Sequence, residues 1–78
     1  FVNERELARA ITLFKYGVAH YPDVPDAHNG LAYGYEQAGL LEDALVEVNK
    51  ALALASEEHQ GYQVYINRRE RLLTQLGK

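Results

Sequence analysis

The residues of this chain whose types could carry out chemistry are few, and their spacing does not bring them together. No His-Glu-x-x-His pattern and no cysteine occurs, so the sequence does not supply the three or four clustered ligands of a zinc site. The hydroxyl residues other than tyrosine do not stand in a Gly-x-Ser-x-Gly context. We therefore expect no metal, no cofactor and no catalytic residue, and predict that the chain is not an enzyme. The candidate metal ligands are His20, His28 and His59, and the candidate nucleophiles are Thr12, Ser56 and Thr74.

Two glycines and a cluster of arginines are the remaining candidates for a site. Gly30 and Gly34 lie four residues apart in a helical pattern, which favours close helix packing, with room for a partner's backbone as the alternative. Residues 61–78 carry four cations against Glu70, a net charge of +3, whereas residues 1–60 carry −6. We interpret the cations as complementing the negative end of a helix; binding of an acidic partner or a phosphate is the alternative. The cluster consists of Arg68, Arg69 and Arg71.

Length and composition limit what these residues can belong to. The 78 residues suffice for one small domain, and a hydrophobic content of 47% is typical of a folded chain. A net charge of −3 argues against a nucleic-acid partner, and no apolar run approaches the roughly 20 residues of a membrane span. The absence of cysteine favours a cytoplasmic location. The start at Phe1 and the absence of methionine indicate a fragment or a processed piece.

Helical periodicity runs through nearly the whole chain. Apolar residues recur at three- and four-residue steps, which predicts an all-α fold of about four helices. The first helix is expected over residues 3–20 with Asn3 as its N-cap, and the second begins after Asp23 as cap and ends at Gly39. A third helix follows at once. Ser56 is expected to cap the last helix, 57–77, with Glu57 and Glu58 in its first turn.

The sequence repeats itself after 34 residues. A shift by 34 places the small and apolar residues of the first helix on those of the third, so the two are expected to be the same element one repeat apart. The matched pairs are Ala10 with Ala44, Ile11 with Leu45, Phe14 with Val48, Gly17 with Ala51 and Val18 with Leu52.

This period resembles that of the tetratricopeptide repeat (TPR). The resemblance covers residues 6–58 and rests on His28, Leu31, Ala32, Tyr35, Gly39, Ala44, Val48 and Ala51, with Pro22 closing the preceding half repeat. The chain departs from the family pattern at His28, where tryptophan is usual, and at Ser56, where proline is usual. The resemblance implies one domain, 1–78, of antiparallel helix pairs. Its parts would be the second helix of an incomplete repeat (3–20), a full repeat (24–55) and a capping helix (57–77).

The same resemblance implies a protein–protein interaction module with a concave, helix-lined groove for a peptide or helix. Family members that clamp an acidic C-terminal tail use Lys and Asn there, but this groove has no Lys and carries Gly30 at the Asn position. We therefore expect a basic or neutral ligand, and expect charge reversal at Glu36 to weaken its binding. The groove residues implied are Asp26, Asn29, Gly30, Tyr33, Glu36, Gln37, Gln63, Asn67 and Glu70.

A structural or oligomerisation module is the alternative function. The first helix lacks a preceding partner, so Leu7, Ile11 and Phe14 are expected to present an unfinished apolar face. That face would mediate a homodimer or docking onto an absent parent domain. Residues 10–22 and 26–54 also resemble the short repeat appended to some bacterial serine hydrolases, which implies that any catalysis belongs to another part of such a protein.

Overall fold

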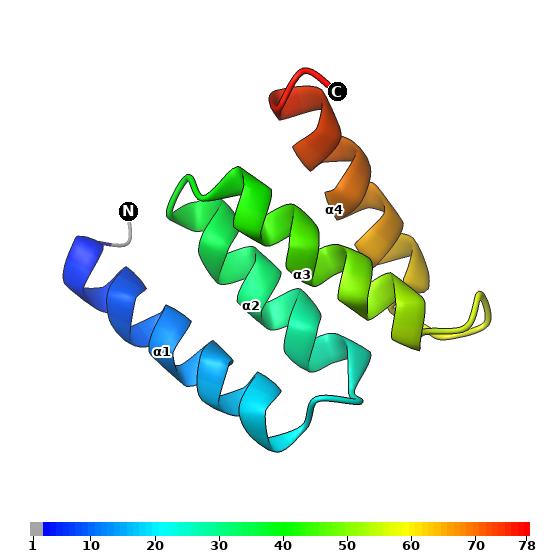
Figure 1. Ribbon diagram of the computed structural model, residues 1–78, viewed down its shortest axis with the longest axis horizontal. Helices are drawn as coiled ribbons and strands as arrows, with labels where there is room; N and C mark the ends of the chain where they lie inside the picture. The colour runs from blue at the N-terminus through cyan, green and yellow to red at the C-terminus, as the bar shows by residue number, and fades with distance from the viewer. Residues whose placement is uncertain (1–2) are drawn as a thin grey trace.

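The fold consists of four α-helices joined by short connections. The computed structural model describes residues 3–78, and within that range it contains no strand. The helices are α1 (Glu4–His20), α2 (Pro25–Gln37), α3 (Leu41–Leu54) and α4 (Tyr62–Gln75). They follow one another across the molecule, with α2 antiparallel to both α1 and α3 (Figure 1). The all-α prediction is confirmed. The expectation of a fragment rests in part on Phe1, which lies outside the described residues.

Two helix ends follow the sequence prediction. The Asn3 side chain accepts a hydrogen bond from the Glu6 amide at 2.8 Å and so caps α1. At the end of α2, Gly39 has a φ of +78°, which glycine adopts without a Cβ clash. Its amide and that of Leu40 donate back to the carbonyls of Glu36 and Tyr35, so the last turn of α2 is closed by its own backbone.

Two predicted N-caps are wrong. Val24, not Asp23, is the N-cap of α2, because Pro25 takes the first helical position and leaves only the residue before it as cap. Ser56 does not cap α4, whose N-cap is Gly61, and Glu57 and Glu58 lie in the connecting loop. A Cβ at Gly61 would stand 2.8 Å from the Tyr65 hydroxyl. Glycine there lets the Tyr65 ring lie across the start of the helix.

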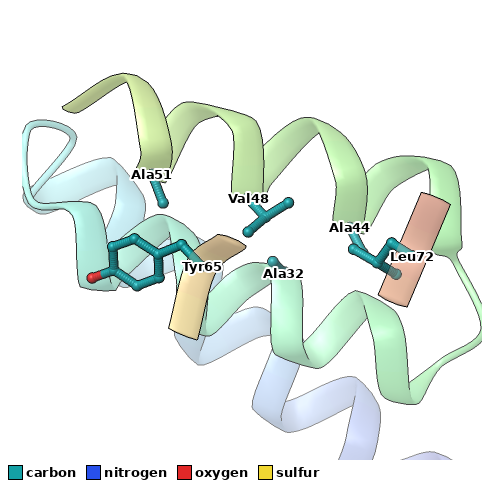
Figure 2. Packing of buried hydrophobic residues seen from close by; sticks show 6 residues of the cluster. All are labelled: Ala32, Ala44, Val48, Ala51, Tyr65 and Leu72. Carbon is teal, nitrogen blue, oxygen red and sulfur yellow. The ribbon is translucent and has the colours of Figure 1, made fainter. Parts of the chain in front are cut away.

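The core lies where α2, α3 and α4 meet. It consists of Ala32 from α2, Ala44, Val48 and Ala51 from α3, and Tyr65 and Leu72 from α4 (Figure 2). The three alanines are fully buried, as the repeat pattern predicted for positions where helices cross closely. Tyr65 and Leu72 fill the larger spaces between them, so α4 is part of the core as well as an end cap.

Helix α1 packs on the opposite side of α2 and contributes no fully buried residue. Its Phe14 ring reaches Gly30 and Gly34, where an added Cβ would stand 3.1 Å from ring carbons. Both glycines therefore allow close packing of α1 on α2. Of the two interpretations of these glycines, close helix packing and room for a partner's backbone, the structure favours the first. One side of α1 is thus covered by α2, and the other side faces outward.

Candidate functional site

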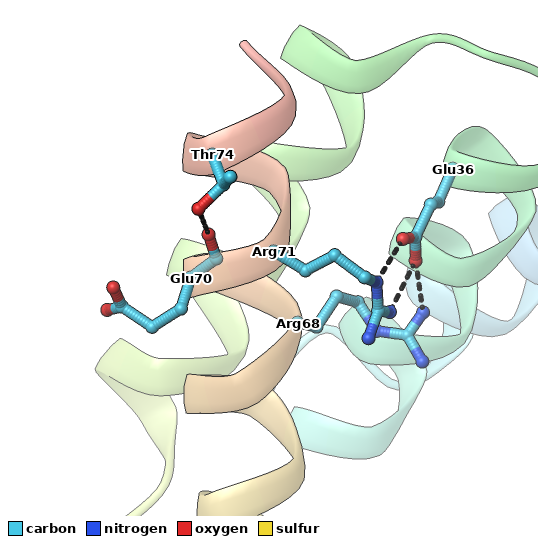
Figure 3. A network of polar contacts seen from close by, with 5 residues as sticks. All are labelled: Glu36, Arg68, Glu70, Arg71 and Thr74. Atoms are coloured by element: carbon cyan, nitrogen blue, oxygen red, sulfur yellow. Dashed lines mark hydrogen bonds and ion pairs between the residues drawn. The ribbon is translucent and has the colours of Figure 1, made fainter. Parts of the chain in front are cut away.

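A carboxylate of α2 is held by two arginines of α4. Arg71 donates to Glu36 from Nε to Oε2 at 2.7 Å and from Nη2 to Oε1 at 2.9 Å, and Arg68 Nη1 donates to Oε1 at 3.1 Å (Figure 3). The Glu36 side chain is only 10% exposed. The hydrogen bond from Arg71 keeps the pKa of Glu36 below its ordinary value, although burial opposes this effect. Glu36 is therefore bound by its own chain and is not an open acidic contact.

The arginine cluster consequently has a different role from either sequence interpretation. Arg68 and Arg71 tie α4 to α2 rather than complementing the end of their own helix. Burial lowers the pKa of Arg68, whereas the bond to Glu36 raises that of Arg71. Arg69 does not contact Glu36; its Nη2 lies 3.4 Å from Oε1 of Glu70 on the same helix.

Tyr33 stands next to this ion pair and remains 45% exposed. The Arg68 guanidinium carbon lies 5.5 Å from the centroid of the Tyr33 ring, within the range of a cation–π contact. Phe14 of α1 packs edge-to-face with the Tyr33 ring, with 6.4 Å between the two ring centroids, and so supports it from the side of α1. Tyr33 is thus an aromatic side chain that contacts Phe14 and Arg68 and still faces solvent.

Matched spacing on the two helices builds the surface around Tyr33. Asn29, Tyr33 and Glu36 follow one another at i, i+4 and i+7 on α2, and so do Val64, Arg68 and Arg71 on α4, so each set lies along one side of its helix. Val64 is 51% exposed and was missed by the sequence analysis, although this spacing could have indicated it. The α2–α4 surface is defined here as Asn29, Tyr33, Glu36, Val64, Arg68 and Arg71.

Two polar atoms of this surface are buried without a partner. Asn29 Oδ1 and Arg68 Nε make no hydrogen bond within the described residues. Both atoms lie beneath the surface, so neither meets a ligand unless its side chain moves.

The other predicted groove residues do not all reach this surface. Gly30 faces Phe14 of α1 and is not open to a ligand. Gln63 donates to Asn67 Oδ1 at 2.9 Å along the exposed side of α4. Gln37 and Glu70 are exposed. The structure therefore brings Tyr33 and Glu36 against the arginines of α4, but it does not bring the nine residues together as one set.

Asp26 belongs to a separate polar cluster at the start of α2. The Tyr65 hydroxyl donates to Asp26 Oδ1, and His59 Nε2 lies 3.2 Å from the same hydroxyl. Burial, followed by the bond to Asp26, raises the pKa of Tyr65 far above its ordinary value. A tyrosine that keeps its proton does not act as a base at neutral pH. The cluster joins the N-terminal ends of α2 and α4 and the loop between α3 and α4.

His28 is a packed structural residue with two hydrogen bonds. Its Nδ1 lies 3.0 Å from Glu47 Oε1 on α3, and its Nε2 lies 2.7 Å from the carbonyl oxygen of Pro22. Because a carbonyl oxygen only accepts, Nε2 carries a proton. Lys50 contacts the second oxygen of Glu47 at 3.2 Å. His28 thus fastens α2 to α3 and to the preceding loop.

The residues of the predicted self-association face are all partly exposed. Ile11 Cγ1 and the Phe14 ring contact the position of Gly34 on α2, and Leu7 is half-buried. Ile11 and Phe14 thus pack on α2, because the two glycines let the helices approach, and a role of the stripe in self-association stays a prediction. The large apolar residues that α1 does expose are Leu13 and Tyr16.

No group of three or more His, Cys, Asp or Glu among residues 3–78 is arranged to hold a metal ion. Within the same range, no helix combines the length and apolar character needed to cross a membrane. Comparison with models of known protein families, with curated proteins and with solved structures found no match.

Proposed function

We propose that this chain is a non-catalytic protein-binding module of the helical-repeat type, which binds a peptide segment of a partner on the α2–α4 surface. The observation that carries the proposal is the half-exposed Tyr33 ring, held between Phe14 and the Arg68 guanidinium. Rigid, supported tyrosines are common anchors of protein interfaces. The resemblance to the tetratricopeptide repeat supports the same function.

The chemistry of the surface favours a neutral peptide. Glu36 is neutralised by two arginines, so the acidic character that pointed to a basic ligand is largely removed. Tyr33 and Val64 offer apolar contact area on the two helices. The expected ligand is an uncharged segment with an aliphatic or aromatic side chain as its anchor.

A displayed library of random linear peptides tests the proposal. Peptides enriched on the wild-type chain are synthesised and titrated while the amide NMR spectrum is followed. We expect the largest shifts at Asn29, Tyr33 and Val64, and expect Tyr33→Ala to weaken binding by at least about tenfold. Reversing the charge of Glu36 is a poorer test than the sequence suggested, because Glu36 also holds α4 in place.

A matched pair of valines provides the control. Val64 on α4 and Val46 on α3 are 51% and 52% exposed, so replacing either by lysine causes a similar loss of exposed apolar surface. Val64→Lys should weaken peptide binding, whereas Val46→Lys should leave it unchanged. Selected peptides that shift only α1 or α3 amides, or that bind both lysine variants equally, contradict the proposal.

A further inference from the structure

The outward side of α1 carries a basic, partly apolar strip. Arg5, Ala8, Arg9, Thr12 and Leu13 line a shallow groove there, and no acidic side chain lines it. Leu13 is 70% exposed. The Thr12 hydroxyl donates to the Ala8 carbonyl at 3.0 Å, so it needs no other partner. Neither arginine forms an ion pair within the described residues, although the chain as a whole has a net charge of −3.

Helix α3 carries the complementary strip at equivalent positions. The 34-residue shift relates Ala8 to Glu42, Arg9 to Asp43 and Thr12 to Val46. All three residues of α3 are exposed, and Val46 is 52% exposed. Asp43 forms no ion pair among the described residues, while Glu42 meets Lys78 only at 3.4 Å. The repeat has therefore placed the cation Arg9 on α1 where it has placed the carboxylate Asp43 on α3.

The directions of the helices allow both strips to pair at once. Helices α1 and α3 run the same way, on either side of α2 (Figure 1). Rotation by 180° about an axis parallel to them sets α1 of one copy on α3 of another, and α3 of the first on α1 of the second. This arrangement requires both strips to lie on the same side of the three helices, and it then sets Arg9 opposite Asp43 and Leu13 near Val46. Such a dimer cannot add a third copy through the same contact, because both copies use the same surface and each surface is then occupied.

We propose that this chain forms a two-fold symmetric dimer through the outward faces of α1 and α3, with Arg9 of each copy paired to Asp43 of the other. The occupant of the α1 groove is a second copy, because the chain itself carries an exposed carboxylate, Asp43, in register with Arg9, and the exposed Val46 in register with Thr12. The dimer does not use the α2–α4 surface and does not depend on its proposed function. Exposed ion pairs contribute little each, so the dimer is weak and weakens further in salt.

Sedimentation equilibrium of the chain over a range of concentrations, at low and high ionic strength, tests the dimer. Arg9→Glu and Asp43→Arg should each weaken dimerisation by at least about tenfold, because each change alters both symmetric pairs. The double variant, Arg9→Glu with Asp43→Arg, should return the affinity to within about threefold of wild type. Recovery by two opposite charge changes is expected only if the two residues face each other.

Lys15→Glu is the matched control. It changes the net charge as much as Arg9→Glu does and lies on the same helix, but Lys15 is placed over the Tyr35 ring of α2 at 5.9 Å. It should leave the dimer affinity nearly unchanged. Circular dichroism verifies that each variant keeps its helix content. Where Asp43→Arg loses helix, Asp43→Asn takes its place and should still weaken the dimer.

Three outcomes overturn the proposal. One is a chain that stays monomeric at every concentration and ionic strength. The second is a dimer whose affinity is the same with Arg9→Glu as with Lys15→Glu, since its interface then lies elsewhere. The third is a folded double variant that dimerises no better than the two single variants, since Arg9 and Asp43 are then not opposite each other.

Discussion

Arg71 and Glu36 are 35 positions apart in the chain and are joined by two hydrogen bonds of 2.7 and 2.9 Å. The guanidinium fork matches the carboxylate in geometry as well as in charge, so the pair fixes direction and distance together. Arg68 adds a third contact from one turn earlier on α4. These bonds bridge α2 and α4 directly, in addition to the packing of both helices on α3. One carboxylate therefore adds a direct polar link between α2 and α4 to the core packing of Tyr65 and Leu72.

Replacing Glu36 by glutamine should loosen α4. The change leaves the half-buried Arg68 without its carboxylate, so we expect the free energy of unfolding in urea to fall by about 1–3 kcal/mol. Hydrogen exchange should rise in α4 more than in α2 and α3. Glu70→Gln removes an exposed carboxylate that contacts Arg69 and should cost less than about 0.5 kcal/mol. Equal losses for the two variants would show that Glu36 does not hold α4.

Acid should remove the contribution of Glu36. Its pKa in the folded chain is lowered, mainly by the hydrogen bond from Arg71. The ionised form is therefore favoured by folding. The resulting stability is present above the unfolded-state pKa of about 4.3 and is lost as the pH falls through the folded value. The difference in unfolding free energy between wild type and Glu36→Gln should be largest at neutral pH and should shrink below about pH 4. A difference that stays constant with pH contradicts this assignment.

The pair of His28 and Glu47 should show strong coupling. His28→Phe keeps a ring at the packed position but leaves the buried Glu47 carboxylate with Lys50 alone, so we expect a loss of about 3 kcal/mol. Adding Glu47→Leu removes the unpaired charge and should recover part of that loss. A double-mutant cycle measured by urea unfolding checks this expectation. Additive losses would mean that the two side chains do not depend on each other.

The helical pattern and the helix-crossing alanines were predictable from the sequence because they depend on short spacings. Asn3 and Gly39 act locally, and Ala44 and Ala51 recur at a helical step. The bond between Arg71 and Glu36 was not predictable, since it depends on the angle at which α4 crosses. A one-residue step turns a helix by about 100°, which explains why Gly30 faces α1 although its neighbour Asn29 lies on the α2–α4 surface.

The start of α4 illustrates why a good local signal can fail. Ser56 has suitable chemistry for a cap, and Glu57 and Glu58 suit a first helical turn. The tertiary contacts of Tyr65 with Asp26 and His59 instead hold the chain so that α4 begins at Tyr62. A contact across 39 positions thus overrides the signal of neighbouring residues.

Tyr65 should lose its proton only when the chain unfolds. Burial raises its pKa, so folding favours the protonated phenol. The stability that it contributes is present below the unfolded-state pKa of about 10 and is lost as the pH rises through the folded value. In an ultraviolet titration, the last tyrosinate to form should appear together with the loss of helix. Tyr65→Phe should abolish that phase and should cost about 1 kcal/mol at neutral pH, because the hydroxyl bond to Asp26 is lost. Persistence of the phase in the variant contradicts the assignment.

Two glycine-to-alanine changes separate helix propensity from packing. Gly17 lies within α1, and a Cβ there meets no atom within 4 Å, so Gly17→Ala should raise the free energy of unfolding by about 0.5–1 kcal/mol. The same change at Gly34 places a Cβ 3.1 Å from both Ile11 and Phe14. The propensity gain is then offset, because α1 must move away from α2.

Urea unfolding of both variants measures the difference, and hydrogen exchange in α1 locates it. We expect Gly17→Ala to leave exchange in α1 unchanged or slower. Gly34→Ala should show faster exchange in α1 and no gain in stability. Equal gains for the two variants would mean that α1 does not pack closely on α2 in solution, and that the stripe of Leu7, Ile11 and Phe14 is free after all.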